Sequence, residues 1–426
     1  MNHLPTSSGS LALTRFPEDP RDQLRAWDAA DEYVLRHLAG NGAGTEPGGG
    51  AEPRTGTEPG AGTGPTAGAG RRTEPGAATD IPPGTTVVAG DRWGALTTAL
   101  AGARASDGVA GEVVQITDSF LGQEATRANL ERNGIDGGAV RLLSTQDAPP
   151  GRIDLLVVRV PKSLALLEDQ LHRLAPAVHA GTVVVGTGMV KEIHTSTLKL
   201  FEQIIGPTKT SLAVKKARLI FCTPDPALAP GPSPWPRSYE LPAGVGAASG
   251  RTVVNHAGVF CAERLDIGTR FFLPNLPRHE GPERVVDLGC GNGVVGTAVA
   301  LANPRAEVVF TDESFQAMAS AEATFRKNLG PDAPAEFRIG DTFAGVEPGS
   351  VDLVLNNPPF HAHQATSDQT SRRMFRGARE ALRPGGELWV VGNRHLSYHV
   401  MLQRTFGNCR VVTSDPKFVI LRAVKR

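Results

Sequence analysis

The sequence is poor in cysteine and carries no excess of charge of either sign. Its four cysteines, Cys222, Cys261, Cys290 and Cys409, stand far apart and form no CxxC pair. This argues against a structural zinc site or a disulfide framework and fits a reducing compartment. The formal net charge is zero, so no global field draws the chain to a nucleic acid or a membrane. A polyanionic partner must therefore be met by a local basic surface.

Long apolar runs are also absent. No stretch reaches the roughly 18 residues that a membrane helix requires, and the N-terminus has no signal-peptide core. We therefore expect a soluble, cytoplasmic protein with no membrane partner. The 426 residues, 40% of them apolar, exceed one ordinary domain and predict two.

Two stretches of biased composition divide the chain. Residues 40–84 are nearly all Gly, Ala, Thr, Pro and Glu, a composition that buries too little apolar surface to offset the entropy of ordering. We expect this insert to be disordered. A Pro-rich stretch begins at residue 223, and we expect 223–250 to be the linker between an N-terminal domain, 1–222, and a C-terminal domain, 251–426.

Both domains alternate short β-branched runs with helical segments. In the C-terminal half, strands are expected at 283–289, 306–312, 351–357 and 386–392, with a helix at 294–303. This alternation predicts an α/β fold with a doubly wound, Rossmann-like parallel sheet. The closing runs "RVVT" and "KFVILRAV", joined by "SDP", predict an antiparallel hairpin at its edge.

The two halves share landmarks in the same order. "TDSF" (117–120) matches "TDES" (311–314), "IDLLVVRVPKS" (153–163) matches "VDLVLNNPPFH" (351–361), and "GTVVVG" (181–186) matches "GELWVVG" (386–392). The repeated order indicates a duplication and two tandem domains of the same kind.

A glycine-rich turn, "DLGCGNG", follows the first of the C-terminal strands and opens a helix. Its glycines allow a sharp turn and close approach of a ligand to the backbone, and the helix N-terminus offers free N–H groups to an anionic group. Asp312, at the end of the second strand, can accept from both ribose hydroxyls of a nucleotide. Candidate cofactor-binding residues are therefore Asp287, Gly289, Gly291, Gly293 and Asp312. NAD-binding sites share this layout, so the motif alone does not name the cofactor.

Asp341, in "GDTF", follows the expected third strand. There its carboxylate could accept from an adenine amino group, which would make it a further cofactor-binding residue. A helix N-cap is an equally good interpretation of the same pattern.

The stretch "NPPF" ends the fourth strand, and the loops after strands one and four face the same crevice. Asn357 offers a side-chain oxygen, and the proline rings hold the carbonyl of Pro358 outward as a second acceptor. Two converging acceptors suit an –NH₂ group, while Phe360 supplies a face for a planar group. Holding both N–H bonds can turn the nitrogen lone pair toward an electrophile.

Together these residues resemble the S-adenosylmethionine-dependent methyltransferases that act on amino nitrogens. "NNPPFHAHQ", "GNRHLSYH", "FGNC", "KFVILRAVKR" and "HAGVFCAERLDIGTRFFL" closely resemble the large-subunit (23S) ribosomal RNA guanine-N2 methyltransferases. The small-subunit (16S) enzymes are relatives with the same duplicated architecture. The resemblance implies that the glycine loop holds S-adenosylmethionine without a metal. It also implies that Asn357, Pro358 and Phe360 hold guanine. Apart from the resemblance, His361, next to this stretch, and Arg394 are candidate substrate contacts.

The N-terminal half departs from this pattern. "AGDRWGAL" (89–96) stands where a glycine loop is expected, and Arg159, Val160 and Pro161 replace Asn-Pro-Pro. We expect this degenerate methyltransferase domain to bind no cofactor. In the family that the chain resembles, such a half looks like an RNA-recognition or scaffolding domain.

Four arginines, Arg372, Arg376, Arg379 and Arg383, recur at helical spacing. They predict either a phosphate-contacting stripe or an ordinary solvated face.

The hypothesis that joins these observations is methyl transfer from S-adenosylmethionine to N2 of a guanine in ribosomal RNA, with 23S favoured over 16S. Three alternatives stay open: a 16S guanine-N2 methyltransferase, a protein-glutamine methyltransferase, and an inactive RNA-binding assembly protein. A nicotinamide dehydrogenase fits poorly because no hydride-transfer acid or base accompanies the glycine loop. The sequence names neither the nucleotide nor the oligomeric state.

Overall fold

The computed structural model describes residues 2–19, 22–40, 81–359 and 364–426. The chain divides into two compact units. The first comprises residues 1–117, 122–143 and 148–232, and the second comprises 118–121, 144–147 and 233–426. Most of the insert expected to be disordered, residues 41–80, lies outside the described residues.

The N-terminal half is built around one seven-stranded sheet preceded by a small hairpin. Its strands are β1 (Asn2–Thr6), β2 (Gly9–Leu13), β3 (Thr86–Ala89), β4 (Val113–Thr117), β5 (Val140–Ser144), β6 (Ile153–Arg159), β7 (Val178–Met189), β8 (Thr208–Thr210) and β9 (Ala217–Cys222). Its helices are α1 (Ala29–Leu38), α2 (Ala95–Asp107), α3 (Phe120–Arg132), α4 (Leu164–Leu174) and α5 (Thr195–Ile204), with short 3₁₀ turns η1 (Gly137–Ala139), η2 (Ala175–Ala177) and η3 (Val190–Glu192).

The C-terminal half repeats this plan. Its strands are β10 (Arg237–Glu240), β11 (Thr252–Asn255), β12 (Glu283–Leu288), β13 (Ala306–Asp312), β14 (Glu336–Ile339), β15 (Val351–Asn356), β16 (Leu382–Asn393), β17 (Arg410–Ser414) and β18 (Phe418–Val424). Its helices are α6 (Ile267–Phe272), α7 (Val294–Ala302), α8 (Phe315–Leu329), α9 (Gln364–Ala381) and α10 (Tyr398–Phe406), with η4 (Gly246–Ala248), η5 (Leu273–Asn275) and η6 (Arg394–Leu396).

The two large sheets have the same strand order. It is β5-β4-β3-β6-β7-β9-β8 in the first and β14-β13-β12-β15-β16-β18-β17 in the second. In the second sheet β12 to β16 pair in parallel, while β18 runs antiparallel to both β16 and β17. The predicted doubly wound sheet with a terminal antiparallel hairpin is therefore confirmed, and the same hairpin ends the first sheet.

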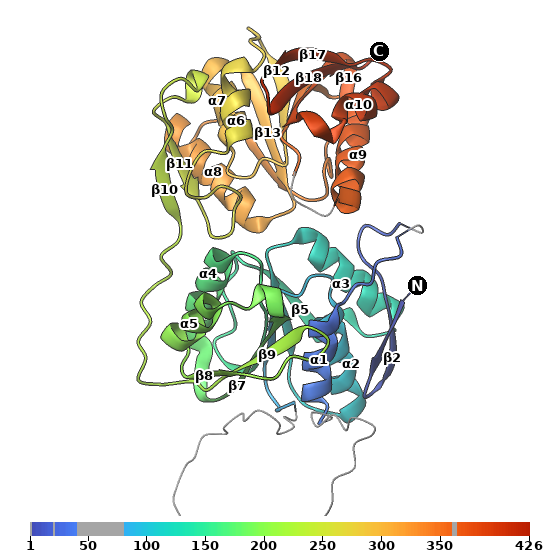
Figure 1. Cartoon of the computed structure of the whole chain (residues 1–426), viewed down its shortest axis with the longest axis vertical. Helices are drawn as coiled ribbons and strands as arrows, with labels where there is room; N and C mark the ends of the chain where they lie inside the picture. Colours follow the sequence, from blue (N-terminus) through green and yellow to red (C-terminus); the bar gives the residue numbers. More distant parts are fainter. Residues whose placement is uncertain (1, 20–21, 41–80, 360–363) are drawn as a thin grey trace, which may run out of the picture. The chain divides into compact units, whose positions relative to one another are not determined.

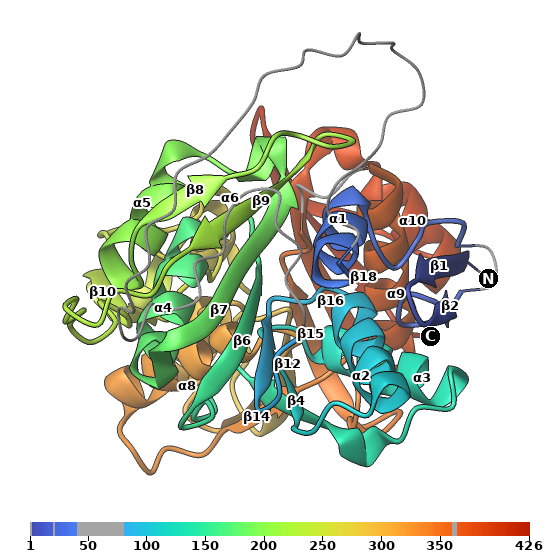
Figure 2. The ribbon, with the colours of Figure 1, turned by 90° about the horizontal axis from the view of Figure 1, so that it is seen from below.

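Each large sheet is covered by helices on both faces. In the second unit α6, α7 and α8 pack on one face, and α9 and α10 pack on the other (Figure 1). In the first unit α1, α2 and α3 share one face, opposite α4 and α5 (Figure 2). Adjacent residues of β12 are buried on opposite faces of the sheet, since Val285 packs with α7 and Val286 packs with α9. Burial on both faces explains why these strands are nearly continuous β-branched runs.

The pairing of strands defines which residues of the two halves are equivalent. Val158 pairs with Ala89 in the first sheet as Asn356 pairs with Leu288 in the second. The next residues along β6 and β15, Arg159 and Asn357, are therefore equivalent, as the sequence comparison predicted.

One predicted equivalence is shifted by a residue. The N–H of Gly90 donates to the carbonyl of Ile116, and the N–H of Gly289 donates to that of Thr311. The residue equivalent to Asp312 is thus Thr117 rather than Asp118. The two "TD" pairs look alike in sequence, but only the sheet pairing sets their register.

The duplication also includes a hairpin before each sheet. Strands β1 and β2 pair antiparallel, as do β10 and β11. The side-chain amide of Asn133 bonds to both backbone groups of Ala12 in β2, and Asn328 does the same with Thr252 in β11. Strand β10 lies inside the segment 223–250 that was expected to be a linker, so that segment contributes a strand to the second unit.

Candidate active site in the second unit

A pocket of about 510 Å³ opens at the carboxyl ends of β12, β13 and β15. Most of the residues singled out from the sequence line it: Asp287, Gly289, Gly291, Asp312, Asp341, Asn357 and Pro358. Residues of the segment before the sheet also line it, among them Tyr239, Phe260, Leu265, Asp266 and Thr269. The glycine loop and the end of β15 therefore face one cavity, although they are far apart in the sequence.

The three glycines of the loop have positive φ but different surroundings. Their φ angles are 67° at Gly289, 54° at Gly291 and 73° at Gly293, values that other residues adopt only with strain. A Cβ on Gly293 would lie 2.7 Å from the Cα of Ala321 in α8, whereas one on Gly291 would meet nothing within 4 Å. Gly293 is thus required for helix packing, and Gly291 borders open space.

Two carboxylates, of the buried Asp287 and the half-buried Asp312, hold the backbone of this region. Asp287 Oδ2 accepts the N–H of Gly296 in the first turn of α7 at 2.8 Å. Asp312 accepts the N–H of Gly291 and that of Ser314, both at 3.0 Å. Burial raises the pKa of Asp287 to about 7 and also raises the pKa of Asp312. Each carboxylate oxygen has a further lone pair, so Asp312 can anchor the loop and still accept from a ligand.

Asp341 lies two residues beyond β14 and lines the pocket. Its carboxylate forms an ion pair with Arg373 of α9, which also lines the pocket. A carboxylate with one arginine partner retains acceptor capacity for an amino group.

Asn357 is the first residue after β15, and its amide group has a defined orientation. Its Nδ2 donates to Thr269 Oγ1 at 3.0 Å and to Asp266 Oδ2 at 3.4 Å. Its Oδ1 is buried and has no hydrogen-bond partner within the described part of the chain. A buried acceptor without a donor is costly, so this oxygen is well suited to receive a donor from a ligand in the pocket.

Three of the predicted substrate and catalytic residues are not among the described residues that line the pocket. Phe360 and His361 lie outside the described residues. Arg394, in η6, is exposed; it donates to the carbonyl of Asp415 at 3.3 Å and is not part of the described pocket lining.

Sequence reasoning missed Asp266 and Thr269. Asp266 is the N-cap of α6, and its side chain accepts the N–H of Thr269 at 2.8 Å. An Asp followed three residues later by Thr is a detectable N-cap pattern, but it predicts a helix start and not a contact with Asn357.

Comparison with known proteins identifies the family of the chain. A "Methyltransferase small domain" model matches residues 250–422, and an "RLMG N-terminal domain" model matches 1–47 and 75–226. A Streptomyces avermitilis protein named ribosomal RNA large subunit methyltransferase G is 63% identical over 99% of this chain and 98% of its own. The protein of that name from Stutzerimonas stutzeri is 43% identical over 99% of both chains. The chain belongs to the ribosomal RNA large subunit methyltransferase G family.

A solved structure agrees with the fold of this methyltransferase G family member. It is the T. thermophilus 16S rRNA N2 methyltransferase RsmC in complex with AdoMet and guanosine. It is 20% identical, with a TM-score of 0.68, and the match covers 100% of this chain and 98% of that one. At this identity the likeness establishes the two-domain fold alone.

The N-terminal half of this family member keeps the outer glycines of the loop but not the middle one. Gly90 and Gly94 occupy the positions of Gly289 and Gly293 and also have positive φ, 79° and 75°. A Cβ on either would lie within 2.6 Å of a neighbouring atom. Arg92 replaces the middle glycine, Gly291. The glycines needed for packing are therefore retained, and the one that borders open space is replaced.

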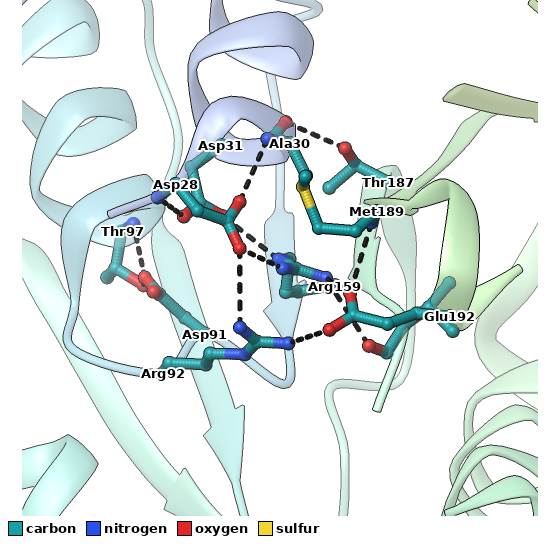
Figure 3. A network of polar contacts seen from close by, with 11 residues as sticks. Asp28, Ala30, Asp31, Asp91, Arg92, Thr97, Arg159, Thr187, Met189 and Glu192 are labelled. Atoms are coloured by element: carbon teal, nitrogen blue, oxygen red, sulfur yellow. Dashed lines mark hydrogen bonds and ion pairs between the residues drawn. The ribbon is translucent and has the colours of Figure 1, made fainter. Parts of the chain in front are cut away.

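Charged side chains fill the N-terminal equivalent of the active site (Figure 3). Arg159, only 1% exposed, pairs with Asp28 at 2.6 Å, Glu192 at 3.0 Å and Asp31 at 3.1 Å. Arg92 pairs with Glu192 at 2.9 Å and with Asp28 at 3.3 Å. Each charged group of the network has at least one partner of opposite charge, which favours a structural role for this half's crevice.

The arginine series on α9 lies on the exposed side of the helix. Arg372, Arg376 and Arg379 are exposed, while Phe375 and Ala378 are buried against the sheet. Arg383, at the start of β16, forms an ion pair with Asp352 and is engaged within the unit.

The described residues contain no group of three or more His, Cys, Asp or Glu side chains able to hold a metal ion. The four cysteines are free thiols. Within the same described ranges, no helix is long and apolar enough to cross a membrane.

Proposed function

We propose that this chain transfers a methyl group from S-adenosylmethionine to the exocyclic N2 amino group of a guanine in large-subunit (23S) ribosomal RNA. The observation that carries the proposal is the buried Oδ1 of Asn357, which has no hydrogen-bond partner among the described residues and lies in the same pocket as the glycine loop. The shared name of the relatives supports ribosomal RNA of the large subunit as the substrate. The T. thermophilus structure contains AdoMet and guanosine, which supports this pair of ligands for the fold.

The pocket fits the cofactor by its shape and by its polar groups. Open space above Gly291 lets a ligand contact the loop backbone, and Asp312 has lone pairs for ribose hydroxyls. Asp287 supports the loop through Gly296, and Gly289 and Gly293 allow it to turn. Asp341, which lines the same pocket, is proposed to accept from the adenine amino group. The bound cofactor supplies the methyl group as an electrophilic sulfonium carbon.

The residues at the end of β15 act on the nucleophile. Asn357 Oδ1 and the carbonyl of Pro358 together accept the two N–H bonds of the guanine amino group. This draws the nitrogen lone pair out of conjugation and fixes its direction. The nitrogen would bond to the methyl carbon as the sulfur–methyl bond breaks, with the electron pair of that bond leaving on the sulfur of S-adenosylhomocysteine. The nitrogen would then lose one of its protons to water, so no side chain has to titrate.

The target guanine has to leave its helix to enter such a pocket. An amino group in a base pair is engaged in hydrogen bonds and stacked, so the base must be unpaired or flipped out. Phe360 is proposed to stack on the extruded base, with His361 and Arg394 as weaker candidates for substrate contact.

The Asn357→Ala variant tests this function. We expect cofactor affinity measured by calorimetry to be unchanged and turnover to fall by about 10²–10³-fold, the usual scale for removing one positioned polar group. Methyl transfer to ribosomal RNA would be measured with labelled cofactor, and mass mapping of RNA from a deletion strain would locate the nucleotide. Wild-type turnover in the variant would exclude a role for the Asn357 side chain in holding the guanine amino group. Labelled methyl groups found in 16S RNA or in protein would show that the substrate is not 23S ribosomal RNA.

A further inference from the structure

We propose that Asp266 and Thr269 are positioning residues that hold the Asn357 amide in one of its two orientations. In that orientation the side-chain oxygen alone faces the base. The inference rests on the proposed function, because it concerns the oxygen that would accept the amino group. It assigns a role to the segment that precedes the catalytic sheet.

The Asp266 carboxylate favours one direction for the hydrogen bonds around it. Asp266 Oδ2 accepts the hydroxyl of Thr269 at 3.2 Å, and a threonine hydroxyl has a single proton. With that proton directed at the carboxylate, Thr269 Oγ1 presents only lone pairs to Asn357. In that arrangement Asn357 supplies the N–H of the 3.0 Å contact. The contact of Asn357 Nδ2 with Asp266 Oδ2 at 3.4 Å favours the same orientation, because an ionised carboxylate can only accept.

A flipped amide would be repelled at the same place. Rotating the Asn357 amide by half a turn would set its oxygen against the Thr269 lone pairs and the Asp266 carboxylate. It would also turn the –NH₂ group toward the pocket, where it would face the N–H donors of the substrate. We call Asp266 and Thr269 the clamp. The clamp makes the site selective for a donor group, such as an amino nitrogen, over a carbonyl oxygen.

The first unit contains the same clamp, which is independent evidence that the fold uses it. Helix α1 contacts β7 and β9 as α6 contacts the equivalent strands β16 and β18, and each helix follows a hairpin. Asp28 is the N-cap of α1, and Asp31 lies three residues later, as Thr269 follows Asp266. Asp28 and Asp31 hold Arg159, the equivalent of Asn357, at 2.6 and 3.1 Å (Figure 3).

The two clamps differ in what they leave free. Arg159 uses its guanidinium on Asp28, Asp31 and Glu192 and is 1% exposed. Asn357 uses only its nitrogen, so its oxygen remains available. In the first unit the helix N-cap and the residue three positions later hold an arginine that occupies the site. In the second unit the equivalent pair orients the Asn357 oxygen as an acceptor.

The test compares Thr269→Val with Thr269→Ser in the full-length chain, assayed on ribosomal RNA. Valine keeps the shape but removes the hydroxyl, so we expect kcat to fall about 10–10²-fold, as for a misplaced catalytic group. KM for RNA and the cofactor dissociation constant should stay within about threefold. Serine restores the hydroxyl and should recover most of kcat. Wild-type kcat in the valine variant, or no recovery with serine, would refute the clamp.

Asp31→Ala provides the matched control, because Asp31 holds the position of Thr269 in the first unit. We expect it to lower the thermal midpoint without changing kcat or cofactor affinity. A loss of kcat equal to that of Thr269→Val would mean that both variants act through general damage to the fold, and would overturn the inference. If the wild-type chain itself transfers no methyl group to RNA, the proposed function fails instead.

Discussion

At the scale of single residues, the glycine loop separates two uses of glycine. Gly293 packs closely against the backbone of α8. Gly291 borders open space, and its N–H donates to Asp312. The N-terminal half retains glycine at the first kind of position, Gly94, and carries Arg92 at the second. Gly291 has a φ of 54°, whereas Arg92 is not among the residues with positive φ, so the side chain at this position goes with a different backbone conformation.

Two alanine variants distinguish these uses. Gly293→Ala should lower the thermal midpoint strongly, because its Cβ would lie 2.7 Å from the Cα of Ala321. Gly291→Ala should lose only the roughly 1–2 kcal/mol that a left-handed residue costs, yet weaken cofactor binding about tenfold or more. Thermal unfolding and calorimetry measure the two effects. Unchanged cofactor affinity in Gly291→Ala would argue against the loop as the binding surface.

At the scale of elements, helix α9 combines a buried and a charged face. Phe375 and Ala378 pack in the core beneath the sheet, and Arg373 reaches Asp341 in the pocket. Arg372, Arg376 and Arg379 are exposed on the same helix. A helix that borders the pocket and carries exposed arginines is suited to contact the phosphates of an RNA whose base enters the site.

Charge reversal on this helix tests its role in RNA binding. We expect the double variant Arg376→Glu and Arg379→Glu to weaken RNA binding. It should also reduce the slope of log affinity against log salt by about one for each phosphate that the helix no longer neutralises. Cofactor affinity should not change. Arg410→Glu, at an exposed position of β17, is the control. Equal weakening in both variants would indicate only a general effect of net charge.

At the scale of the whole molecule, one topology appears twice and carries an open site once. The two large sheets have matching strand order, and each is preceded by a hairpin and a clamping helix. The first crevice is filled by the network of Arg92 and Arg159 with three carboxylates. Opening it would leave several buried charges unpaired, which is strongly unfavourable.

The filled crevice predicts a stoichiometry of one cofactor per chain. Calorimetric titration of the full-length protein with S-adenosylmethionine should give a single class of sites with one molecule bound. Gly291→Ala should weaken that one class, with no second class remaining. Two bound molecules per chain would show that the N-terminal network opens to admit a ligand.

Local sequence signals were sufficient to predict the architecture and most of the residues that line the pocket. Buried parallel strands are runs of β-branched residues, loops with positive φ require glycine, and two prolines mark a rigid strand end. These requirements act within a few residues, so β12, the loop at 287–293 and Asn357 could be predicted. The parallel sheet then brings the ends of β12 and β15 to one edge.

Only the tertiary structure decided which distant side chains meet. Asp266 and Thr269 lie 91 and 88 residues before Asn357, and Asp28 lies 131 residues before Arg159. Likewise, only strand pairing identified Thr117 as the equivalent of Asp312. By itself, the sequence determined the elements and the chemical groups at their ends, because backbone conformation and burial are local demands on residue type. The orientation of the Asn357 amide, and the closure of the first crevice, depend on partners that only the folded chain brings within hydrogen-bonding distance.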